Sequence, residues 1–150
     1  MISMPRLWHH IYLKEKAALK RELGRLAITI ERLEATPGAG LSASRPFVDI
    51  AVRVASLVMA QRAAKRLKKL GYEHDPKKSE PGRLFLAKRT EVAHHRLHLI
   101  HIKEIWDRHV VFRDYLKKHR RYKREYERLK KKGSKKARQE FIDQVVALAG

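Results

Sequence analysis

The sequence predicts an α/β fold in which a small mixed β-sheet is flanked by helices. From Pro5 onward, apolar residues recur three and four positions apart, which is typical of an amphipathic helix. The segment after this helix alternates between apolar and polar residues, as a half-buried strand does. Further strand-like and helical stretches follow along the chain. Because both kinds of element share one chain, we expect helices packed against a sheet.

Four segments are predicted to form the strands of this sheet, at residues 27–33, 46–54, 83–88 and 92–102. The first alternates in polarity and should be half-buried. The second is richer in apolar residues and is predicted to be a central strand with both faces covered. Asp49 lies within this apolar run, and a buried carboxylate needs a hydrogen-bonding partner, a metal ion or a proton.

Helices are predicted for most of the remaining chain. The first begins at Pro5, which suits a first helical turn, and ends near Gly24. One acidic residue, Glu15, interrupts its apolar stripe. The other helices are predicted at residues 56–70, 103–119 and 121–132, with a last helix capped by Ser134. The apolar stripes of the last two helices are Tyr122, Tyr126 and Leu129, and Phe141, Val145 and Leu148.

The 150 residues carry a large excess of positive charge. Lys plus Arg total 36 against 16 Asp plus Glu, which gives a formal net charge of +20 and a pI of about 10.6. Such a protein repels itself unless a polyanion neutralises it, so nucleic acid is the expected partner. The length and the 43% of hydrophobic residues predict one domain over residues 1–150, including a basic helical segment at 103–150.

Composition excludes some kinds of site. The chain has no cysteine, which rules out disulfides and thiolate metal sites. No stretch approaches the roughly 18 apolar residues of a membrane span, so we expect a cytoplasmic protein with no membrane partner. The chain also lacks asparagine and is rich in Lys, Arg and Glu, which predicts a thermophilic source because amide side chains are thermolabile.

Two stretches of the chain resemble one known family. The first is IERLEATPGAGLSASRPFVDIAV, from Ile30 to Val52, and the second is WDRHVVFRDYLKKHRRYKREYERL, from Trp106 to Leu129. They are similar to the signatures of the GrpB-like family of the nucleotidyltransferase superfamily, and the resemblance covers most of the chain. In that family a Gly-Ser turn follows the first strand, and the next strand carries a metal-binding acid, here Asp49. The resemblance implies a nucleotidyltransferase-like topology.

The residues that would carry transferase chemistry depart from the family's pattern. Glu34 and Ala35 stand where the family has Gly and Ser, and no second acid follows Asp49 closely. A carboxylate in the turn would repel triphosphate oxygens, and the metals of such a site need two or three carboxylates. Glu31, Glu34 or a distant acid could complete a metal site. Alternatively, Asp49 accepts hydrogen bonds from the loop that follows the first strand or pairs with an arginine. We predict a vestigial pocket with no catalytic residue, metal or cofactor, made of Glu34, Thr36, Asp49, His94 and His98.

Four histidines, His94, His95, His98 and His101, invite a metal hypothesis. On a strand, His94, Arg96 and His98 share one face, whereas His95 and His101 fall on the other. His94 and His98 then lie too far apart to hold one ion unaided, with Arg96 between them. We expect no bound metal. The resemblance implies instead that this strand lies beside the family's pocket.

The strongest functional signal lies between residues 117 and 138. This segment holds thirteen basic residues against two acids, Glu125 and Glu127. The basic residues are Lys117, Lys118, Arg120, Arg121, Lys123, Arg124, Arg128, Lys130, Lys131, Lys132, Lys135, Lys136 and Arg138. Pairs within the helix, such as Arg121 with Glu125, cannot neutralise that excess. A solvated face of a thermophilic protein would mix both signs, so the pattern favours a phosphate-binding surface.

These observations predict an RNA-binding protein, ribosomal or ribosome-associated, that binds ribosomal RNA through a basic helical surface on a catalytically decayed fold. The sequence has no recognition-helix motif for the DNA major groove, whereas folded RNA can be held by its shape and phosphates. Ribosomal RNA and neighbouring ribosomal proteins are the expected partners. The alternatives are an active metal-dependent nucleotidyltransferase of the GrpB-like family and a DNA-compacting protein.

Overall fold

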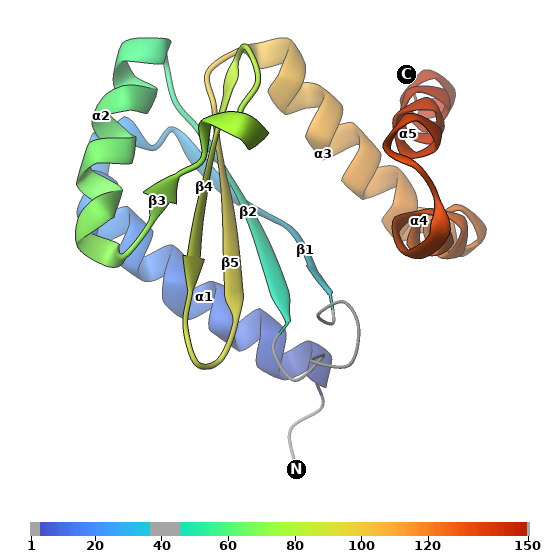
Figure 1. Cartoon of the computed structure of the whole chain (residues 1–150), viewed down its shortest axis with the longest axis horizontal. Helices are drawn as coiled ribbons and strands as arrows, with labels where there is room; N and C mark the ends of the chain where they lie inside the picture. Colours follow the sequence, from blue (N-terminus) through green and yellow to red (C-terminus); the bar gives the residue numbers. More distant parts are fainter. Residues whose placement is uncertain (1–3, 37–45, 150) are drawn as a thin grey trace. The chain divides into compact units, whose positions relative to one another are not determined.

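The computed structural model describes residues 4–36 and 46–149 (Figure 1). The chain divides into two compact units, Met1–Trp106 and Asp107–Gly150, which we call the sheet unit and the helical unit. The sheet unit holds all the described strands, and the described part of the other unit is helical. This division does not test the predicted single domain over residues 1–150, which stays a prediction.

The sheet unit is built on a five-stranded mixed sheet with the strand order β1-β2-β5-β4-β3. β2 and β5 run parallel, and the other neighbouring strands run antiparallel. The strands are β1 Thr29–Thr36, β2 Phe47–Arg53, β3 Glu73–His74, β4 Arg83–Arg89 and β5 His94–Ile100. The predicted mixed sheet is confirmed. The sequence does not predict β3, because its two residues are both exposed and too few to show a period.

The register of the sheet brings distant chain positions side by side. Asp49 in β2 lies opposite Arg96 in β5 and opposite Glu34 in β1. The pairing of β1 shifts between Arg32 and Glu34, where the strand accommodates an extra residue. β1 continues to Thr36, beyond its predicted end at residue 33. The turn positions that depart from the family's pattern therefore belong to the end of this strand.

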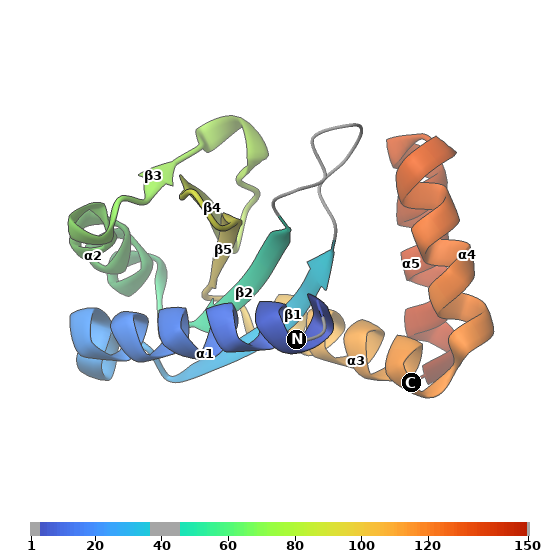
Figure 2. The same cartoon turned by 90° about the horizontal axis from the view of Figure 1, so that it is seen from below.

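Two helices, α1 Met4–Leu23 and α2 Leu57–Leu67, pack on the same face of the sheet. Figure 2 shows α1 running across the strands. Fully buried residues from both helices and three strands form the core, including Leu19, Leu23, Val48, Ile50, Val52, Ala60, Ala63, Leu67, Leu97 and Leu99. The alternation of apolar residues in the strands supplies one side of this core, and the helical stripes supply the other.

The ends of α2 follow from capping residues. At the start, the hydroxyl of Ser56 accepts a hydrogen bond from the backbone N–H of Met59 at 3.2 Å. After a short 3-10 turn, Lys68–Leu70, the chain reverses at Gly71, whose φ of +94° favours glycine. The predicted helix over residues 56–70 is thus confirmed. It leads the chain back to β3 at the edge of the sheet.

The prediction that both faces of the second strand are covered holds only in part. Val48, Ile50 and Val52 are buried on the face that α1 and α2 cover. On the other face, Phe47, Asp49 and Arg53 are only partly buried. The apolar run concealed this difference, because Ala51 is buried although it lies on the more polar side.

Helix α3, Lys103–Lys118, begins in the sheet unit beside the turn that precedes β4. That turn contains Gly82, with φ of +90°. A Cβ at this position would lie 2.5 Å from the Cδ1 atom of Ile105 and 2.7 Å from that of Ile102. The backbone conformation therefore favours glycine, and a larger residue would also have to displace the side chains of Ile102 and Ile105.

The helical unit contains the rest of α3 together with α4, Arg120–Lys132, and α5, Lys135–Ala149. Its small core is formed by Phe112, Leu116 and Val145, against which further aromatic and aliphatic side chains pack, among them Tyr115, Tyr122, Tyr126, Phe141, Ile142 and Val146. The hydroxyl of Ser134 caps α5, as predicted, by accepting a hydrogen bond from the N–H of Ala137 at 3.0 Å. The predicted stripe of α5 is wrong at Leu148, which is 59% exposed.

Candidate functional site

One face of the sheet carries side chains that could take part in chemistry. We call it the polar face and define it by Asp49, Arg83, His94, Arg96 and His98, which come from β2, β4 and β5. These side chains alternate with the buried residues of the core face, because successive side chains of a strand point to opposite sides. The alternation of His94, Arg96 and His98 with buried His95, Leu97 and Leu99 confirms the face predicted from the sequence.

The carboxylate of Asp49 is held by the guanidinium of Arg96. Arg96 Nε donates to Asp49 Oδ1 at 2.7 Å, and Arg96 Nη2 donates to Oδ2 at 2.6 Å. The Asp49 side chain is 14% exposed and that of Arg96 is 34% exposed, so water screens the pair only in part. Arg96 also lies over the ring of Phe47, with its Cζ atom 4.4 Å from the ring centroid. Arg96 is therefore a bidentate partner of Asp49. Pairing with an arginine was one of the alternatives that the sequence left open for this carboxylate.

His98 links this pair to a second arginine. Its Nδ1 lies 2.7 Å from Arg83 Nη1, and its Nε2 lies 3.7 Å from Asp49 Oδ1. A guanidinium can only donate, so Nδ1 of His98 must be the acceptor and the ring hydrogen belongs on Nε2, which faces the carboxylate. Arg83 is also engaged by Glu80, at 3.4 Å. The polar face thus forms a continuous chain of charged and hydrogen-bonding groups.

The surroundings of Asp49 shift its pKa. Burial on its own raises the pKa of this carboxyl, because it disfavours the charged form. The neighbouring His98 and the charge and hydrogen bonds of Arg96 outweigh that effect and hold the pKa of Asp49 below its ordinary value. The carboxylate is therefore ionised at neutral pH, with its charge balanced by an arginine.

The polar face does not fit a divalent metal ion of the kind that a nucleotidyltransferase uses. Both oxygens of Asp49 are occupied by Arg96, which also places a fixed positive charge where a cation would have to sit. Within residues 4–36 and 46–149, no group of three or more His, Asp or Glu side chains is arranged to hold a metal. The absence of a catalytic residue at this face stays a prediction, and Arg96 is the residue that occupies the carboxylate of Asp49.

The residues of the predicted vestigial pocket occupy neighbouring positions in the sheet. Glu34 is paired with Asp49, and Phe47 lies in register between Thr36 and His94. The ring of His94 lies 4.8 Å from that of Phe47. The side chains of Glu34 and Thr36 lie outside the described part of the structure, so only their backbone positions are known.

A buried ionic cluster on the core face was missed by sequence reasoning. Glu15 Oε2, in α1, accepts hydrogen bonds from Tyr72 at 2.6 Å and from Lys88 Nζ at 2.5 Å. The Glu15 and Lys88 side chains are only 11% and 13% exposed, so this pair is well removed from water. His95 is buried beside them, and its Nδ1 has no hydrogen-bond partner among the described residues. The available signal was the acid that interrupts the apolar stripe of the first helix.

Burial and charge act against each other in this cluster. Burial raises the pKa of Glu15, but the hydrogen bonds of Lys88 and Tyr72 more than compensate and lower it overall. Burial and the nearby Glu15 charge together raise the pKa of Tyr72, so the phenol stays protonated. Burial lowers the pKa of His95, which keeps its imidazole neutral. The carboxylate of Glu15 thus holds α1 to the sheet through Tyr72 and Lys88.

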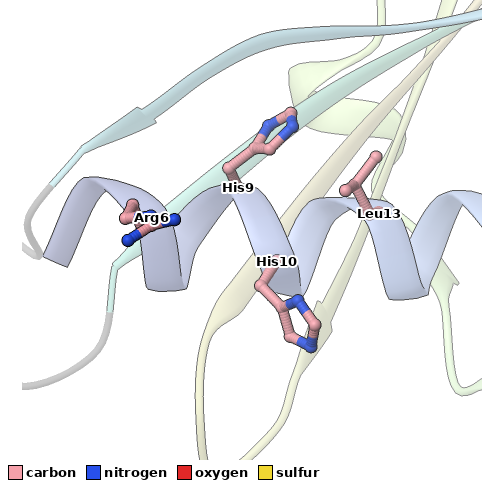
Figure 3. Close-up of a pocket in the computed structure, with 4 residues that line it drawn as sticks. All are labelled: Arg6, His9, His10 and Leu13. Carbon is pink, nitrogen blue, oxygen red and sulfur yellow. The ribbon is translucent and has the colours of Figure 1, made fainter. Parts of the chain in front are cut away.

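An open depression on α1 does not assemble a site. The described residues that line it are Arg6, His9, His10 and Leu13, all from the same helix (Figure 3). His9 and His10 project in different directions from α1. Arg32 lies 3.2 Å from Nδ1 of His9, so this histidine already has a strand partner. We assign no function to this depression.

The basic segment predicted from the sequence lies in the helical unit and faces solvent. Lys117 and Lys118 end α3, and most of the other cations lie on α4 and at the start of α5. All thirteen basic residues between 117 and 138 are exposed except Lys130 and Arg138, which are partly buried. Tyr122 and Tyr126 of the predicted stripe pack against the core of the unit, and Leu129 is partly buried. The amphipathic helix predicted here is confirmed.

Acidic side chains do little to neutralise this surface. Glu125 is bonded to Arg128, one turn further along α4, and not to Arg121 as its spacing also allowed. Hydrogen bonding to that arginine is the main reason why the pKa of Glu125 is lowered. In the stretch 46–149, no carboxylate pairs with Arg120, Arg121 or Arg124. Their charges are therefore available to an external anion.

The charges at the helix starts are also unfavourable for an isolated protein. α4 and α5 have no acidic residue in their first turns, which instead contain Arg120, Arg121, Lys135 and Lys136. The amino end of a helix carries a partial positive charge, so cations there are destabilising by a few tenths of a kcal/mol each. A bound anion would relieve this repulsion.

Among the described residues, none of the helices has the length and apolar character of a membrane span.

The chain is similar in sequence to known proteins. It is 30% identical over 155 residues to the glutamate-rich protein GrpB of Alkalihalophilus pseudofirmus, covering 93% of this chain and 88% of that protein. It is 29% identical over 125 residues to the UPF0157 protein YqkA of Bacillus subtilis, covering 83% of this chain but only 36% of the relative.

A solved structure and a family model agree with these relatives. The crystal structure of the conserved protein GrpB from Enterococcus faecalis has the same fold, with a TM-score of 0.64 at 19% identity, over 95% of this chain and 92% of that one. The model of the GrpB protein family matches residues 2–146. The fold is consistent with the nucleotidyltransferase-like superfamily to which the sequence resemblance pointed. The chain therefore belongs to the GrpB family.

Proposed function

We propose that this GrpB-family protein binds RNA through the exposed basic surface of its helical unit. The observation that carries the proposal is the group of exposed cations on α4, of which Arg120, Arg121 and Arg124 have no acidic partner among the described residues. Counterions released from RNA phosphates would supply the free energy of binding. The helix holds these charges at fixed positions, from which phosphate contacts can orient the protein on an RNA.

The charge balance of this chain supports a polyanionic partner. It has 36 Lys plus Arg against 16 Asp plus Glu. We infer that the basic surface serves a polyanionic partner, and a ribosomal RNA is the partner that we propose.

A ribosomal or ribosome-associated location follows from the same argument. A polyanion relieves the self-repulsion of a very basic protein, and ribosomal RNA is an abundant polyanion. Sedimentation of the native protein with ribosomal subunits tests this. We expect the protein to stay bound after a wash in high salt if it is a component of the particle, and its release into the wash would count against a ribosomal role.

A second candidate function is metal-dependent nucleotidyl transfer, which one observation favours. Glu34 and Asp49 occupy paired backbone positions in β1 and β2, so two acidic residues share one register position of the sheet. Against this, Arg96 already holds both oxygens of Asp49. We expect no turnover of nucleoside triphosphates with magnesium or manganese. Turnover that disappears in Asp49→Asn would favour the transferase instead.

The RNA-binding proposal is tested by the salt dependence of affinity. For a protein that neutralises on the order of 6 to 10 phosphates, log affinity falls linearly with log salt concentration, by roughly 10³ to 10⁵ between about 50 and 200 mM, with duplex DNA as the guide. We expect a slope in this range for binding to ribosomal RNA fragments. A slope near zero would mean that phosphate contacts do not drive binding.

A further inference from the structure

The corner between α3 and α4, at the start of the basic segment, holds a group of packed aromatic rings. We call it the aromatic corner and define it by Tyr115, His119 and Tyr122. The rings of Tyr115 and His119 are stacked, with centroids 3.9 Å apart and an angle of 17° between their planes. Tyr122 meets both rings edge-on, at 5.4 Å from Tyr115 and 6.3 Å from His119. Aromatic rings thus continue from the core of the helical unit to its surface.

The outermost ring, that of His119, is exposed yet held in place. Its Nδ1 lies 2.9 Å from the backbone carbonyl oxygen of Tyr115. A carbonyl can only accept, so the hydrogen of the imidazole belongs on Nδ1 and is donated to Tyr115. Stacking on one face and this hydrogen bond at one edge fix the plane of the ring. The exposed ring of His119 is therefore preorganised, because its orientation is fixed before a ligand binds.

The hydrogen bond to Tyr115 caps the last turn of α3, but capping does not require the ring to stack on Tyr115 or to lie at the surface. His119 occupies the position before α4, but its side chain makes no capping hydrogen bond to that helix. It is also exposed, unlike Tyr115 and Tyr122, which are partly buried and pack against the core of the unit. The packing of the core therefore explains the two tyrosines but not the histidine.

Exposed cations lie on both sides of His119 in the sequence. Lys117 and Lys118 precede it, and Arg120 and Arg121 follow it, all of them exposed. Proteins that bind single-stranded nucleic acid combine these two features, because bases stack on aromatic rings while neighbouring phosphates contact cations. A paired base cannot reach such a ring, since its faces are covered by its neighbours in the helix.

We propose that the aromatic corner binds an unpaired RNA base, which stacks on the exposed face of His119 while Lys117, Lys118, Arg120 or Arg121 contact the adjoining phosphates. This rests on the proposed function and sharpens it, because it names RNA with a single-stranded segment as the preferred ligand. Folded RNA offers such segments in loops and bulges, where bases are free to stack on a protein.

The experiment compares two RNA probes that carry the same number of phosphates, a single strand of mixed sequence and a hairpin duplex with a minimal loop. His119→Ala should weaken binding of the single strand by about 5- to 150-fold, the usual range when one stacked ring is removed. The salt slope should not change, because the interactions with phosphates are all kept. Binding of the hairpin duplex should be unaffected.

Two further variants separate stacking from other roles of the histidine. His119→Phe should restore most of the affinity for the single strand, because it keeps the ring without a titratable nitrogen. His10→Ala, at an exposed histidine of α1, is the matched control and should bind both probes like the wild type. Circular dichroism of each variant checks that the helices persist.

The outcomes distinguish this inference from the broader proposal. Equal weakening of both probes by His119→Ala, no weakening of either, or no recovery in His119→Phe would overturn the stacking site while leaving the basic surface intact. Wild-type protein that binds neither probe would overturn RNA binding itself and the stacking site with it.

Discussion

Lys88 and Arg96, in the sheet unit, are each bonded to a single carboxylate on opposite faces of the sheet. In the helical unit, Arg120, Arg121 and Arg124 are exposed and have no such partner among the described residues. Lys and Arg side chains therefore have different roles in the two units. Where cations are paired and partly buried, they fix the positions of strands and helices. Where they are exposed and crowd together, they raise the free energy of the isolated protein and lower that of a complex with a polyanion.

The two units also differ in the chemistry that their surfaces offer. On the polar face, both oxygens of Asp49 accept hydrogen bonds from Arg96. In the helical unit, exposed cations lie close to aromatic side chains. Substitutions of the paired charges in the sheet unit should change the free energy of unfolding. Substitutions of the exposed cations in the helical unit should change the affinity for RNA.

The largest effect on stability is expected at Glu15. Glu15→Ala leaves Lys88 charged, almost buried and without its carboxylate, which typically costs about 3–5 kcal/mol of unfolding free energy. Tyr72 loses its hydrogen-bond acceptor in the same step. Urea unfolding of the wild type and the variant measures the difference.

Glu22 provides the matched control on the same helix. Its partner, Lys69, is largely exposed, and the Lys69 Nζ atom lies 3.7 Å from Glu22 Oε1. Glu22→Ala should therefore lower the unfolding free energy by less than about 1 kcal/mol. Similar losses in the two variants would show that the Glu15 cluster contributes no more than a surface pair. The distinction between paired, buried charges and exposed ones would then fail within the sheet unit itself.

A smaller effect is expected at Asp49. Asp49→Asn removes the charge that Arg96 holds and should cost roughly 1.5–3 kcal/mol at pH 7, the range for hydrogen bonds to charged groups. Because the folded-state pKa of Asp49 is lowered, its contribution is fully present above the unfolded-state value of about 3.9 and is lost as the pH falls through the folded-state value. Unfolding curves at a series of pH values should therefore show the two proteins converging in acid. A constant difference down to the lowest pH would contradict this account.

No effect on metal content is expected at the histidines of the polar face. His94 and His98 each already contact an arginine, Arg89 and Arg83 respectively, and the purified protein should carry no stoichiometric zinc. Replacing both with glutamine should leave the metal content unchanged by elemental analysis. One tightly held ion per chain, lost in that double variant, would restore the metal hypothesis and make the polar face a functional site.

Much of the fold could be predicted because it depends on local patterns. The alternation of His94 to Leu99 places each side chain on its correct face, and Gly71 and Ser134 mark helix ends through their own conformations and hydrogen bonds. The two-residue strand β3 gave no such signal. The reach of β1 past residue 33 was also hidden, because its pairing with β2 shifts at an irregularity that the sequence does not mark.

The site could be predicted only where one residue sufficed to reveal it. A carboxylate in an apolar run, Asp49, requires a partner, and an arginine was among the possibilities. The identity of that arginine depends on the register between β2 and β5. Asp49 and Arg96 lie 47 positions apart in the sequence. The cluster of Glu15, Tyr72 and Lys88 draws on three separate elements, so no spacing within one of them could reveal it. The aromatic corner was likewise hidden, because tyrosines at helical spacing are usually core residues.

The central claim is that the exposed cations of the helical unit, and not basic residues in general, bind RNA. Two triple variants with the same reduction in charge test it directly. Arg120→Gln, Arg121→Gln and Arg124→Gln together alter α4, whereas Arg62→Gln, Lys65→Gln and Lys68→Gln together alter exposed cations of α2 and of the short turn after it. Surface substitutions usually shift stability by only about 0.5 kcal/mol each, so a thermal melt should show both variants folded.

The measurement is the salt dependence of binding to ribosomal RNA fragments for the wild type and both variants. The α4 variant should have a slope shallower by about one unit for each phosphate that it no longer binds, and the α2 variant should match the wild type. An unchanged slope in the folded α4 variant, or an equal change in both variants, would mean that the segment from 117 to 138 is only a solvated surface and would contradict the account.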